Sequence, residues 1–514
     1  MCLVPVLNDR SGPRSNGGLV PLGLACAAAV LLTQAPARAE EGDWPALMDP
    51  PSIYAKDGVI ALTASSQDVK IGAATLPGLV YNGLYTAPVM HARPGERLVI
   101  RFINNLQQVS NLHYHGIQTS PLGSSDNASI EVKPGESFLY SVKIPTTQPP
   151  GTYWYHPHQH GIVENQVMGG LSGALIIDGF AEQFPELKDI KERLLVLKEY
   201  EWESSDDPYI ESYLHDRLQT INGQEHVTIS MRPHETQLWH IANVGPNKII
   251  HLSIPGLRFR VLGQDGVARN IEDVTETLPV LPGGRFEVLV EAADAGTYNL
   301  NSDKVLTGKD RTRVLGHVVV AGEPAVPVPP ITTFPSREDL REVDVDTRRT
   351  VVFSQDMGAE KFYLDGQQFD HKRTDFRVPL GSVQEWKLVN KTGDFHDFHI
   401  HQLHFQVVAM NDKPVPFVGL QDTVRIPEQG SITIRLAFTR PEIVGRFYYH
   451  CHVLQHEDRG MMASIEVYDP NAPPTKSENP LPKKAELSPV RSWLARWTSQ
   501  PEQKWDLPYG YCGL

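Results

Sequence analysis

The chain has 514 residues, of which 40% are hydrophobic, and a formal net charge of −14. Its length predicts two to four domains, and its negative charge argues against nucleic acid or an anionic membrane surface as the partner. Four cysteines are too few for a disulfide scaffold. The 41 prolines and 40 glycines between short apolar runs favour an all-β protein.

The first 39 residues are predicted to be an export signal. Arg10 and Arg14 precede an apolar run over 19–32, and Ala37-Arg38-Ala39 follows as an A-x-A cleavage site. A run of about 14 apolar residues is too short to cross a bilayer. We therefore expect cleavage after Ala39, a mature chain without a transmembrane segment, and a periplasmic or secreted location.

The rest of the chain contains one pattern three times. In each copy a turn precedes an alternating strand, and an asparagine stands nine positions after the second residue of the turn: Asn104, Asn243 and Asn390. Further on, a glycine opens another strand in each copy: Gly151, Gly296 and Gly445. This spacing fits one β-sandwich domain per copy. We predict domains at 50–185, 186–323 and 341–470, a Pro-rich linker at 324–340, and a Pro- and Lys-rich tail at 471–514.

Histidines stand where the copies align. His113 and His399 follow the repeat asparagine by nine residues, and His156 and His450 follow the repeat glycine by five. Each opens an H-x-H pair, and the second copy has none; the pairs are His113/His115, His156/His158, His399/His401 and His450/His452. Because residues i and i+2 of a strand face the same side, each pair presents two neighbouring imidazoles. Eight imidazoles at an interface of the first and third domains suit three ions of copper, zinc, iron or nickel.

Cys451 lies between the two histidines of the last pair, so its side chain is expected to face the interior of the third domain. There it can meet His396, His456 and Met461, of which Met461 is preferred over the adjacent Met462. Two imidazoles, a thiolate and a weak thioether are the ligands of a blue-copper electron-transfer site. The cysteine is covalently continuous with the histidines on either side, which predicts a through-bond electron route to the other ions.

Four further features are expected to have ordinary structural roles. His160 and His404 extend two of the clusters, but we expect them to lie beside the ligands rather than to bind metal. Asp265 in Gly263-Gln264-Asp265-Gly266 is predicted to form a turn, and Pro282-Gly283-Gly284 a strand connection.

The chain resembles the three-domain multicopper oxidases, in particular the laccase-like branch of bacteria. The signatures are His113-Tyr114-His115-Gly116, His156-Pro157-His158, His396-Asp397-Phe398-His399-Ile400-His401, and His450-Cys451-His452 with His456 and Met461. The resemblance implies three cupredoxin-like Greek-key sandwiches and four copper ions. It implies a type 1 copper on Cys451, His396 and His456 with Met461 axial, a type 2 copper on His113 and His399, and a type 3 pair on His115, His156 and His452 and on His158, His401 and His450.

The implied activity takes four single electrons from a reducing substrate and reduces O₂ to water, with Glu457 and Asp126 as candidate proton relays. Phenols or aromatic amines are the expected substrates. An oxidase of Cu(I), Fe(II) or Mn(II) is the alternative, which the small number of methionines, nine, disfavours. A non-catalytic scaffold is the least favoured interpretation, because the whole ligand set is present. We expect a monomer, in which Cys512 is free or makes an intermolecular contact.

Overall fold

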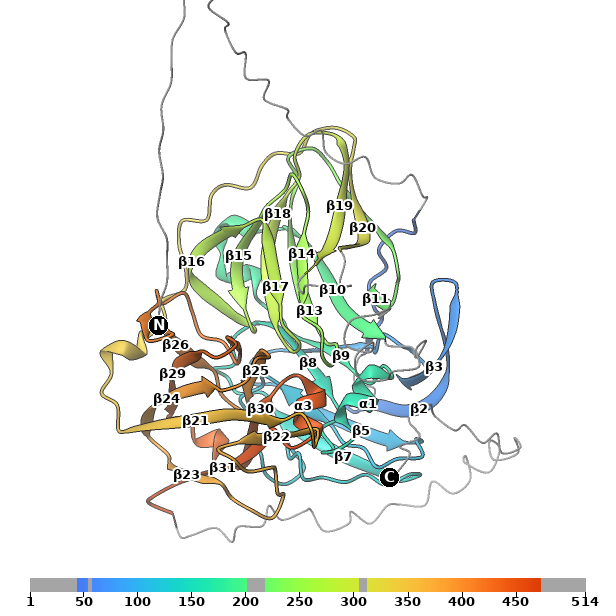
Figure 1. Cartoon of the computed structure of the whole chain (residues 1–514). Helices are drawn as coiled ribbons and strands as arrows, with labels where there is room; N and C mark the ends of the chain where they lie inside the picture. Colours follow the sequence, from blue (N-terminus) through green and yellow to red (C-terminus); the bar gives the residue numbers. More distant parts are fainter. Residues whose placement is uncertain (1–43, 54–57, 201–217, 305–311, 473–514) are drawn as a thin grey trace, which may run out of the picture. The chain divides into compact units, whose positions relative to one another are not determined.

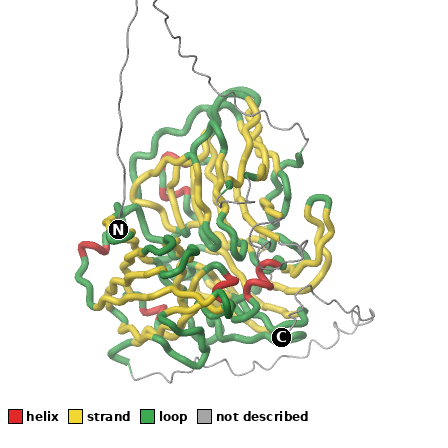
Figure 2. Tube along the Cα trace, viewed as in Figure 1, coloured by secondary structure: helices red, strands yellow, loops and turns green. Residues whose placement is uncertain are grey.

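The computed structural model describes residues 44–53, 58–200, 218–304 and 312–472. Strands dominate the regular structure and the helices are short (Figure 1, Figure 2). The strands form six sheets, which fall into three consecutive pairs along the chain. The all-β fold class predicted from the sequence is therefore confirmed. Within the described ranges, no helix has the length and apolar character needed to cross a membrane.

The first pair of sheets, called sandwich 1, comes from residues 52–177 and is drawn in blue and cyan in Figure 1. Phe102, Tyr140 and Leu175 belong to the single apolar core that both sheets enclose. One sheet has the order β1 (Ser52–Ile53), β4 (Val89–Ala92), β9 (Gly173–Ile177), β8 (Gly151–His156), β6 (His113–His115), and the other β3 (Ala74–Tyr81), β2 (Ile60–Ile71), β5 (Arg97–Asn104), β7 (Ser137–Lys143).

Sandwich 2 comes from residues 191–320 and encloses a core that contains Trp239, Leu252 and Val288. One sheet has the order β11 (Leu218–Ile221), β10 (Lys191–Tyr200), β13 (Thr236–Asn243), β18 (Arg285–Glu291), β15 (Phe259–Gln264), β16 (Val267–Thr275). The other has the order β12 (Val227–Met231), β20 (Arg313–Val320), β19 (Gly296–Asp303), β14 (Ile250–Ser253), β17 (Thr277–Val280).

Sandwich 3 comes from residues 347–468, and Cys451 belongs to its apolar core together with Trp386 and Phe398. One sheet has the order β22 (Lys361–Leu364), β21 (Thr347–Asp356), β24 (Ser382–Asn390), β29 (Ser431–Phe438), β26 (Phe405–Met410), β27 (Lys413–Pro414). The other has the order β23 (Phe376–Pro379), β31 (Met462–Tyr468), β30 (Gly445–Cys451), β25 (His396–Ile400), β28 (Thr423–Ile426).

The repeat asparagines make the same contacts in all three sandwiches. The side chain of Asn104 donates to the carbonyl four residues later and accepts the N–H two residues later. Asn390 repeats both bonds at the same offsets, and Asn243 repeats them with the acceptor carbonyl five residues later, at Lys248. Each also donates to the carbonyl of a distant segment, at Val132, Val280 and Ile426 respectively. Because this buried amide closes the loop after the strand, the three copies share one structural device as well as a sequence pattern.

Two short helices connect the sandwiches. In sandwich 1, helix α1 (Val163–Met168) begins where the carboxylate of Asp458 accepts the N–H groups of Gly161, Val163 and Glu164. Asp458 ends helix α3 (Leu454–Asp458) of sandwich 3, which packs against α1. Asp458 therefore supplies N-terminal acceptors that α1 lacks in its own sequence. The 3₁₀ turns are η1 (Ala181–Gln183), η2 (Pro185–Leu187), η3 (Leu340–Glu342) and η4 (Pro441–Ile443).

Candidate metal centres

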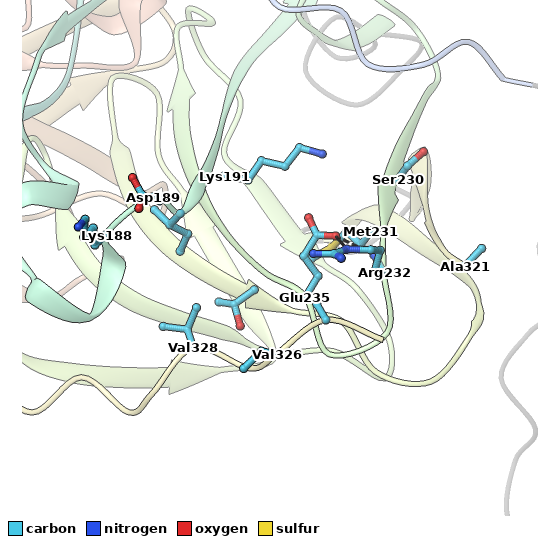
Figure 3. Close-up of a pocket in the computed structure, with 13 residues that line it drawn as sticks. Lys188, Asp189, Lys191, Ser230, Met231, Arg232, Glu235, Ala321, Val326 and Val328 are labelled. Atoms are coloured by element: carbon cyan, nitrogen blue, oxygen red, sulfur yellow. Dashed lines mark hydrogen bonds and ion pairs between the residues drawn. The ribbon is translucent and has the colours of Figure 1, made fainter. Parts of the chain in front are cut away.

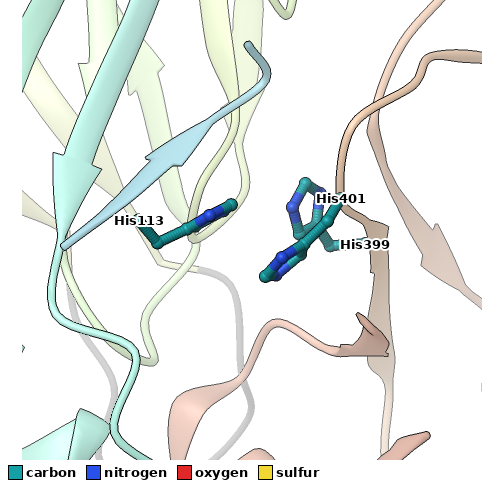
Figure 4. Close-up of side chains that lie close together, drawn as sticks. All are labelled: His113, His399 and His401. Atoms are coloured by element: carbon teal, nitrogen blue, oxygen red, sulfur yellow. The ribbon is translucent and has the colours of Figure 1, made fainter. Parts of the chain in front are cut away.

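The histidine pairs lie on neighbouring strands within sandwiches 1 and 3. On sandwich 1, His113 of β6 stands opposite His156 of β8. On sandwich 3, His399 of β25 stands opposite His450 of β30. In Figure 4, His113 extends from sandwich 1 toward His399 and His401 of sandwich 3. The pairs predicted at aligned repeat positions therefore meet across the interface of these two sandwiches.

One trio of histidines has its donor atoms arranged around a common point. The Nε2 atoms of His158 and His401 each lie 3.3 Å from Nε2 of His450. All three side chains are buried, and their donor atoms lie within 4.8 Å of one another. These are the three residues that the resemblance assigns to one ion of the type 3 pair.

The other cluster histidines lie in three overlapping groups, one of which is made by His115, His399 and Asp422. His113, His399 and His401 form another group, and His113, His115 and His156 form the third. The ring of His113 stacks on His401, and the ring of His115 on His399, each with centroids 3.8 Å apart. The groups therefore bring together both expected type 2 ligands and two of the three expected ligands of the other type 3 ion.

His452, the third expected ligand of that ion, falls in none of these groups. Its ring centroid lies 4.9 Å from that of His115 and 6.0 Å from that of His156. It nevertheless borders the same cluster, because its centroid is also 5.5 Å from that of His399.

The cluster histidines carry buried nitrogen atoms that no protein group contacts. Burial lowers the pKa of six of these side chains well below 6.5, and nearby imidazoles or Arg285 lower it further. The six are His115, His156, His158, His399, His401 and His452. Their imidazoles are therefore neutral near pH 7, as metal binding requires. The buried nitrogens without a hydrogen-bond partner are Nε2 of His113, His156 and His399, Nδ1 of His115 and His158, and both ring nitrogens of His452.

On several rings the opposite nitrogen is held by an oxygen. Nδ1 of His156 lies 2.9 Å from the carbonyl of Pro157, and Nδ1 of His399 lies 2.9 Å from the carbonyl of Asp422. For His115 the order is reversed, because Nε2 lies 3.1 Å from Oδ1 of Asp422 and leaves Nδ1 unpartnered. Such contacts fix the tautomer and the orientation of metal-binding histidines. The donor set therefore fits copper.

A separate trio lies in sandwich 3. The thiol sulfur of Cys451 is 3.6 Å from Nδ1 of both His396 and His456, and these two nitrogens are 3.2 Å apart. Burial, with a smaller contribution from Asp397, raises the pKa of the Cys451 thiol, so copper binding there displaces a proton. Met461 is fully buried, and its backbone carbonyl accepts the N–H of Cys451. The trio matches the cysteine and the two histidines expected for a blue-copper site.

The two predicted acidic residues both reach the histidine cluster. The two carboxylate oxygens of Asp126 lie 3.0 and 3.1 Å from Nδ1 of His113, and Gln402 donates to the same carboxylate. Glu457 is fully buried, with one carboxylate oxygen 3.0 Å from Nδ1 of His450 and the other 3.6 Å from Nε2 of His158.

His404 and His160 lie near the cluster ligands without joining a potential metal group. His404 lies 2.9 Å from the carbonyl of Asp265 through Nε2. The ring of His160 packs edge-on against Phe369, with centroids 4.8 Å apart. Neither occurs in any of the five potential metal groups found among the described residues.

Sequence reasoning missed an ion pair that joins sandwich 2 to the cluster. Arg285 and Asp422 are completely buried, and the guanidinium donates to both carboxylate oxygens, at 2.8 and 2.7 Å. Asp265 does occupy a turn, at φ +50°, and its carboxylate also accepts the N–H groups of Arg285, Asp422 and Thr423. No periodicity or motif distinguishes these residues in the sequence, because their partners come from different sandwiches.

Two glycines allow this close packing. A Cβ on Gly283 would lie 3.0 Å from ring atoms of both His115 and His452, so the predicted strand connection also forms a wall of the cluster. A Cβ on Gly116 would lie 2.6 Å from the Arg285 guanidinium and 2.8 Å from the Asp422 carboxylate. Both have a positive φ, +79° and +87°, which a side chain would strain.

The described residues also form a cavity of about 530 Å³ in and beside sandwich 2. Its walls carry Lys188, Lys191 and Arg232 together with Asp189 and Glu235 (Figure 3). None of the candidate ligands lines this cavity, so it is separate from the histidine and cysteine sites.

Three β-sandwiches, a cysteine-containing site in the last one and a histidine cluster between the first and the last define a class of copper protein built from cupredoxin-like domains. Three family models, each described as multicopper oxidase, match residues 63–181, 198–320 and 338–471. The chain belongs to the multicopper oxidase family. It is therefore a copper-dependent oxidoreductase that uses O₂, with one type 1, one type 2 and two type 3 copper ions as cofactors.

Known relatives resemble the chain over most of its length. It is 25% identical over 407 residues to a multicopper oxidase of Staphylococcus haemolyticus, covering 76% of this chain and 83% of that protein. It is 28% identical over 482 residues to an iron transport multicopper oxidase of Epichloe festucae, covering 77% and 73%. A solved laccase-like multicopper oxidase of Ochrobactrum sp. superposes with a TM-score of 0.69 at 26% identity, covering 82% of this chain and 100% of that one. The predicted cupredoxin-like fold is confirmed.

Proposed function

We propose that the chain is a laccase-like oxidase of phenols or aromatic amines that uses the ligand set predicted from the four signatures. His396, Cys451 and His456, together with Met461, would hold the type 1 ion, and His113 and His399 would hold the type 2 ion. The type 3 ions would be held by His115, His156 and His452 and by His158, His401 and His450. The main support for this proposal is that the four H-x-H pairs lie close together, next to the end of the strand that carries His450 and Cys451. Bound copper supplies one-electron oxidation at the first site and four-electron reduction of O₂ at the cluster.

The residues around Cys451 provide the electron route. Cys451 is bonded through the backbone to His450 and His452, whose side chains lie at the cluster. A shorter connection runs from the carbonyl of Cys451 to Nδ1 of His450, 3.0 Å away. Two covalent routes, through the backbone to His450 and to His452, and one hydrogen bond therefore connect the thiolate with the cluster.

Asp126 and Glu457 are proposed to hold the protons that water formation consumes. The carboxylate of Asp126 lies at the sandwich 1 side of the cluster, where it contacts His113 and accepts a hydrogen bond from Gln402. Glu457 lies at the opposite type 3 trio, between His158 and His450. Carboxylates placed within hydrogen-bond reach of the reacting site are suited to general acid catalysis.

Two observations favour an organic substrate. Every potential metal group found among the described residues contains a histidine of the four signatures, so these residues do not form a separate docking group for a metal ion. A solved relative is described by its oxidase activity towards lignin model compounds and lignosulfonate, which supports the same choice.

The alternative function is oxidation of a metal ion, favoured by the similarity to an iron transport multicopper oxidase. The experiment that separates the two loads the purified chain with copper and records O₂ uptake with a methoxyphenol, Fe(II), Cu(I) and Mn(II) in parallel. Turnover of the phenol without turnover of the metal ions supports the laccase-like function. Turnover of a metal ion without that of the phenol contradicts it.

We also propose the domain limits 50–185, 186–323 and 341–470, with the linker at 324–340. The sheets at 52–177, 191–320 and 347–468 and the family matches at 63–181, 198–320 and 338–471 support this proposal. The export signal at 1–39, residues 473–514 of the predicted tail at 471–514, and Cys512 lie outside the described residues. A monomeric periplasmic or secreted enzyme remains our expectation. N-terminal sequencing of the exported chain and its mass in solution test both parts.

A further inference from the structure

A buried ion pair lies beside the cysteine site. Asp397 of β25 stands opposite Arg425 of β28, and both carboxylate oxygens accept hydrogen bonds from the guanidinium at 2.8 Å. The Asp397 side chain is fully buried and that of Arg425 is 23% exposed. The guanidinium also lies over the ring of Phe395, 3.7 Å from its centroid. Because water is largely excluded, the field of each charge is weakly screened.

Both charges act on ligands of the type 1 site. Asp397 directly follows His396, and its backbone carbonyl accepts the N–H of His452. On the neighbouring strand, Arg425 stands directly before Ile426, which pairs with His396. One negative and one positive charge therefore lie next to the backbone of a type 1 ligand.

We propose that the Asp397–Arg425 ion pair sets the reduction potential of the type 1 copper through two opposed electrostatic effects. This inference rests on the proposed function of the cysteine site. Oxidised copper carries one more positive charge than reduced copper, so the Asp397 carboxylate stabilises the oxidised ion and the Arg425 guanidinium stabilises the reduced ion. Asp397 and Arg425 are positioning residues, since they act on the copper site through its ligands and not on substrate.

The test measures the ratio of reduced to oxidised type 1 copper in the copper-loaded full chain, from its visible absorption at fixed ambient potentials. We expect Asp397→Asn to raise this ratio about tenfold and Arg425→Gln to lower it about tenfold, each equivalent to about 59 mV for a one-electron couple. The double variant is expected to lie within about threefold of the wild type, because both charges are then absent.

Two variants serve as controls. Arg425→Lys keeps the positive charge and is expected to restore most of the ratio that Arg425→Gln loses. Arg377→Gln removes the same charge from the Arg377–Glu466 pair in the same sheet, where Arg377 is 55% exposed, and is expected to leave the ratio unchanged. If Arg425→Gln does not fold, the comparison of Asp397→Asn with the double variant measures the Arg425 effect without an unpaired carboxylate.

The inference is overturned if both single variants shift the ratio of reduced to oxidised copper in the same direction, or if neither shifts it more than twofold. A loss of packing does not depend on the sign of the charge removed, so only an electrostatic effect predicts opposite shifts. A wild-type chain that takes up copper without blue absorption overturns the proposed function instead. The two failures are therefore distinguishable.

Discussion

Acid should destabilise the chain to the same extent with and without bound copper, because the folded chain keeps the ligand imidazoles unprotonated in both forms. Eight candidate ligands have a folded-state pKa below the unfolded value of about 6.5, chiefly because of burial: His115, His156, His158, His396, His399, His401, His452 and His456. As pH falls through 6.5, the unfolded chain binds protons at these positions and the folded chain does not. The free energy of unfolding therefore falls with decreasing pH.

The size of the effect follows from the number of protons. Burial raises the pKa of three carboxyl groups, those of Asp265, Glu287 and Asp458, which bind protons more readily in the folded chain and offset up to three of the eight. Burial also lowers the pKa of His404 to about 4, which adds one proton. About six protons remain, and at about 1.4 kcal/mol each per pH unit they amount to about 8 kcal/mol per unit below pH 6.5. This is comparable to the whole stability of a typical domain.

Urea unfolding at pH 7.5, 6.5 and 5.5, with and without copper, measures this pH dependence. The unfolding midpoint of the copper-free chain is expected to collapse between pH 6.5 and 5.5. The copper-loaded chain should start from a higher midpoint, because copper binds the folded chain, and its free energy of unfolding should fall with pH by the same amount. Ordinary exposed carboxylates titrate below this window and contribute little. A free energy of unfolding of the copper-free chain that does not fall between pH 6.5 and 5.5 would refute the inference that these imidazoles are held neutral for metal.

Three substitutions test other parts of the structure. Cys451→Ser should remove the blue absorption and substrate oxidation while the circular dichroism spectrum stays unchanged; oxidation at the normal rate contradicts the electron route. Arg285→Met leaves the Asp422 carboxylate unpaired in the interior and should cost about 3–5 kcal/mol of unfolding free energy in urea titration, and a cost below 1 kcal/mol means that the ion pair has no structural role. Asn104→Ala removes three hydrogen bonds of the repeated loop and should cost about 3 kcal/mol by the same assay, whereas the exposed-pair variant Arg258→Ala should cost less than 1 kcal/mol.

The fold and most of the cluster could be predicted because they rest on local patterns. The asparagine at the end of each repeated strand makes the same loop-closing contacts every time, so its spacing marks equivalent positions. His113 and His399 stand at one such position, and strand alternation then determines which neighbouring side chains share their face. Cys451 was predicted to face the other way by the same rule, and it lies in the apolar core of sandwich 3.

The support for the cluster could not be predicted in this way. Asp422 reaches His115 from sandwich 3, Arg285 reaches Asp422 from sandwich 2, and Gly283 approaches His452 from a turn. Each contact depends on how two sandwiches pack, which leaves no periodic signal in either segment. Sandwich 2 lacks cluster histidines, so the sequence indicated no role for it at the site, yet its buried arginine and glycine enclose the cluster.

The copper content of the purified chain tests the central claim most directly. After copper loading and removal of free metal, elemental analysis with a parallel visible spectrum should give close to four copper ions per chain and a blue absorption that Cys451→Ser abolishes. A colourless chain that retains one copper ion or fewer contradicts the account.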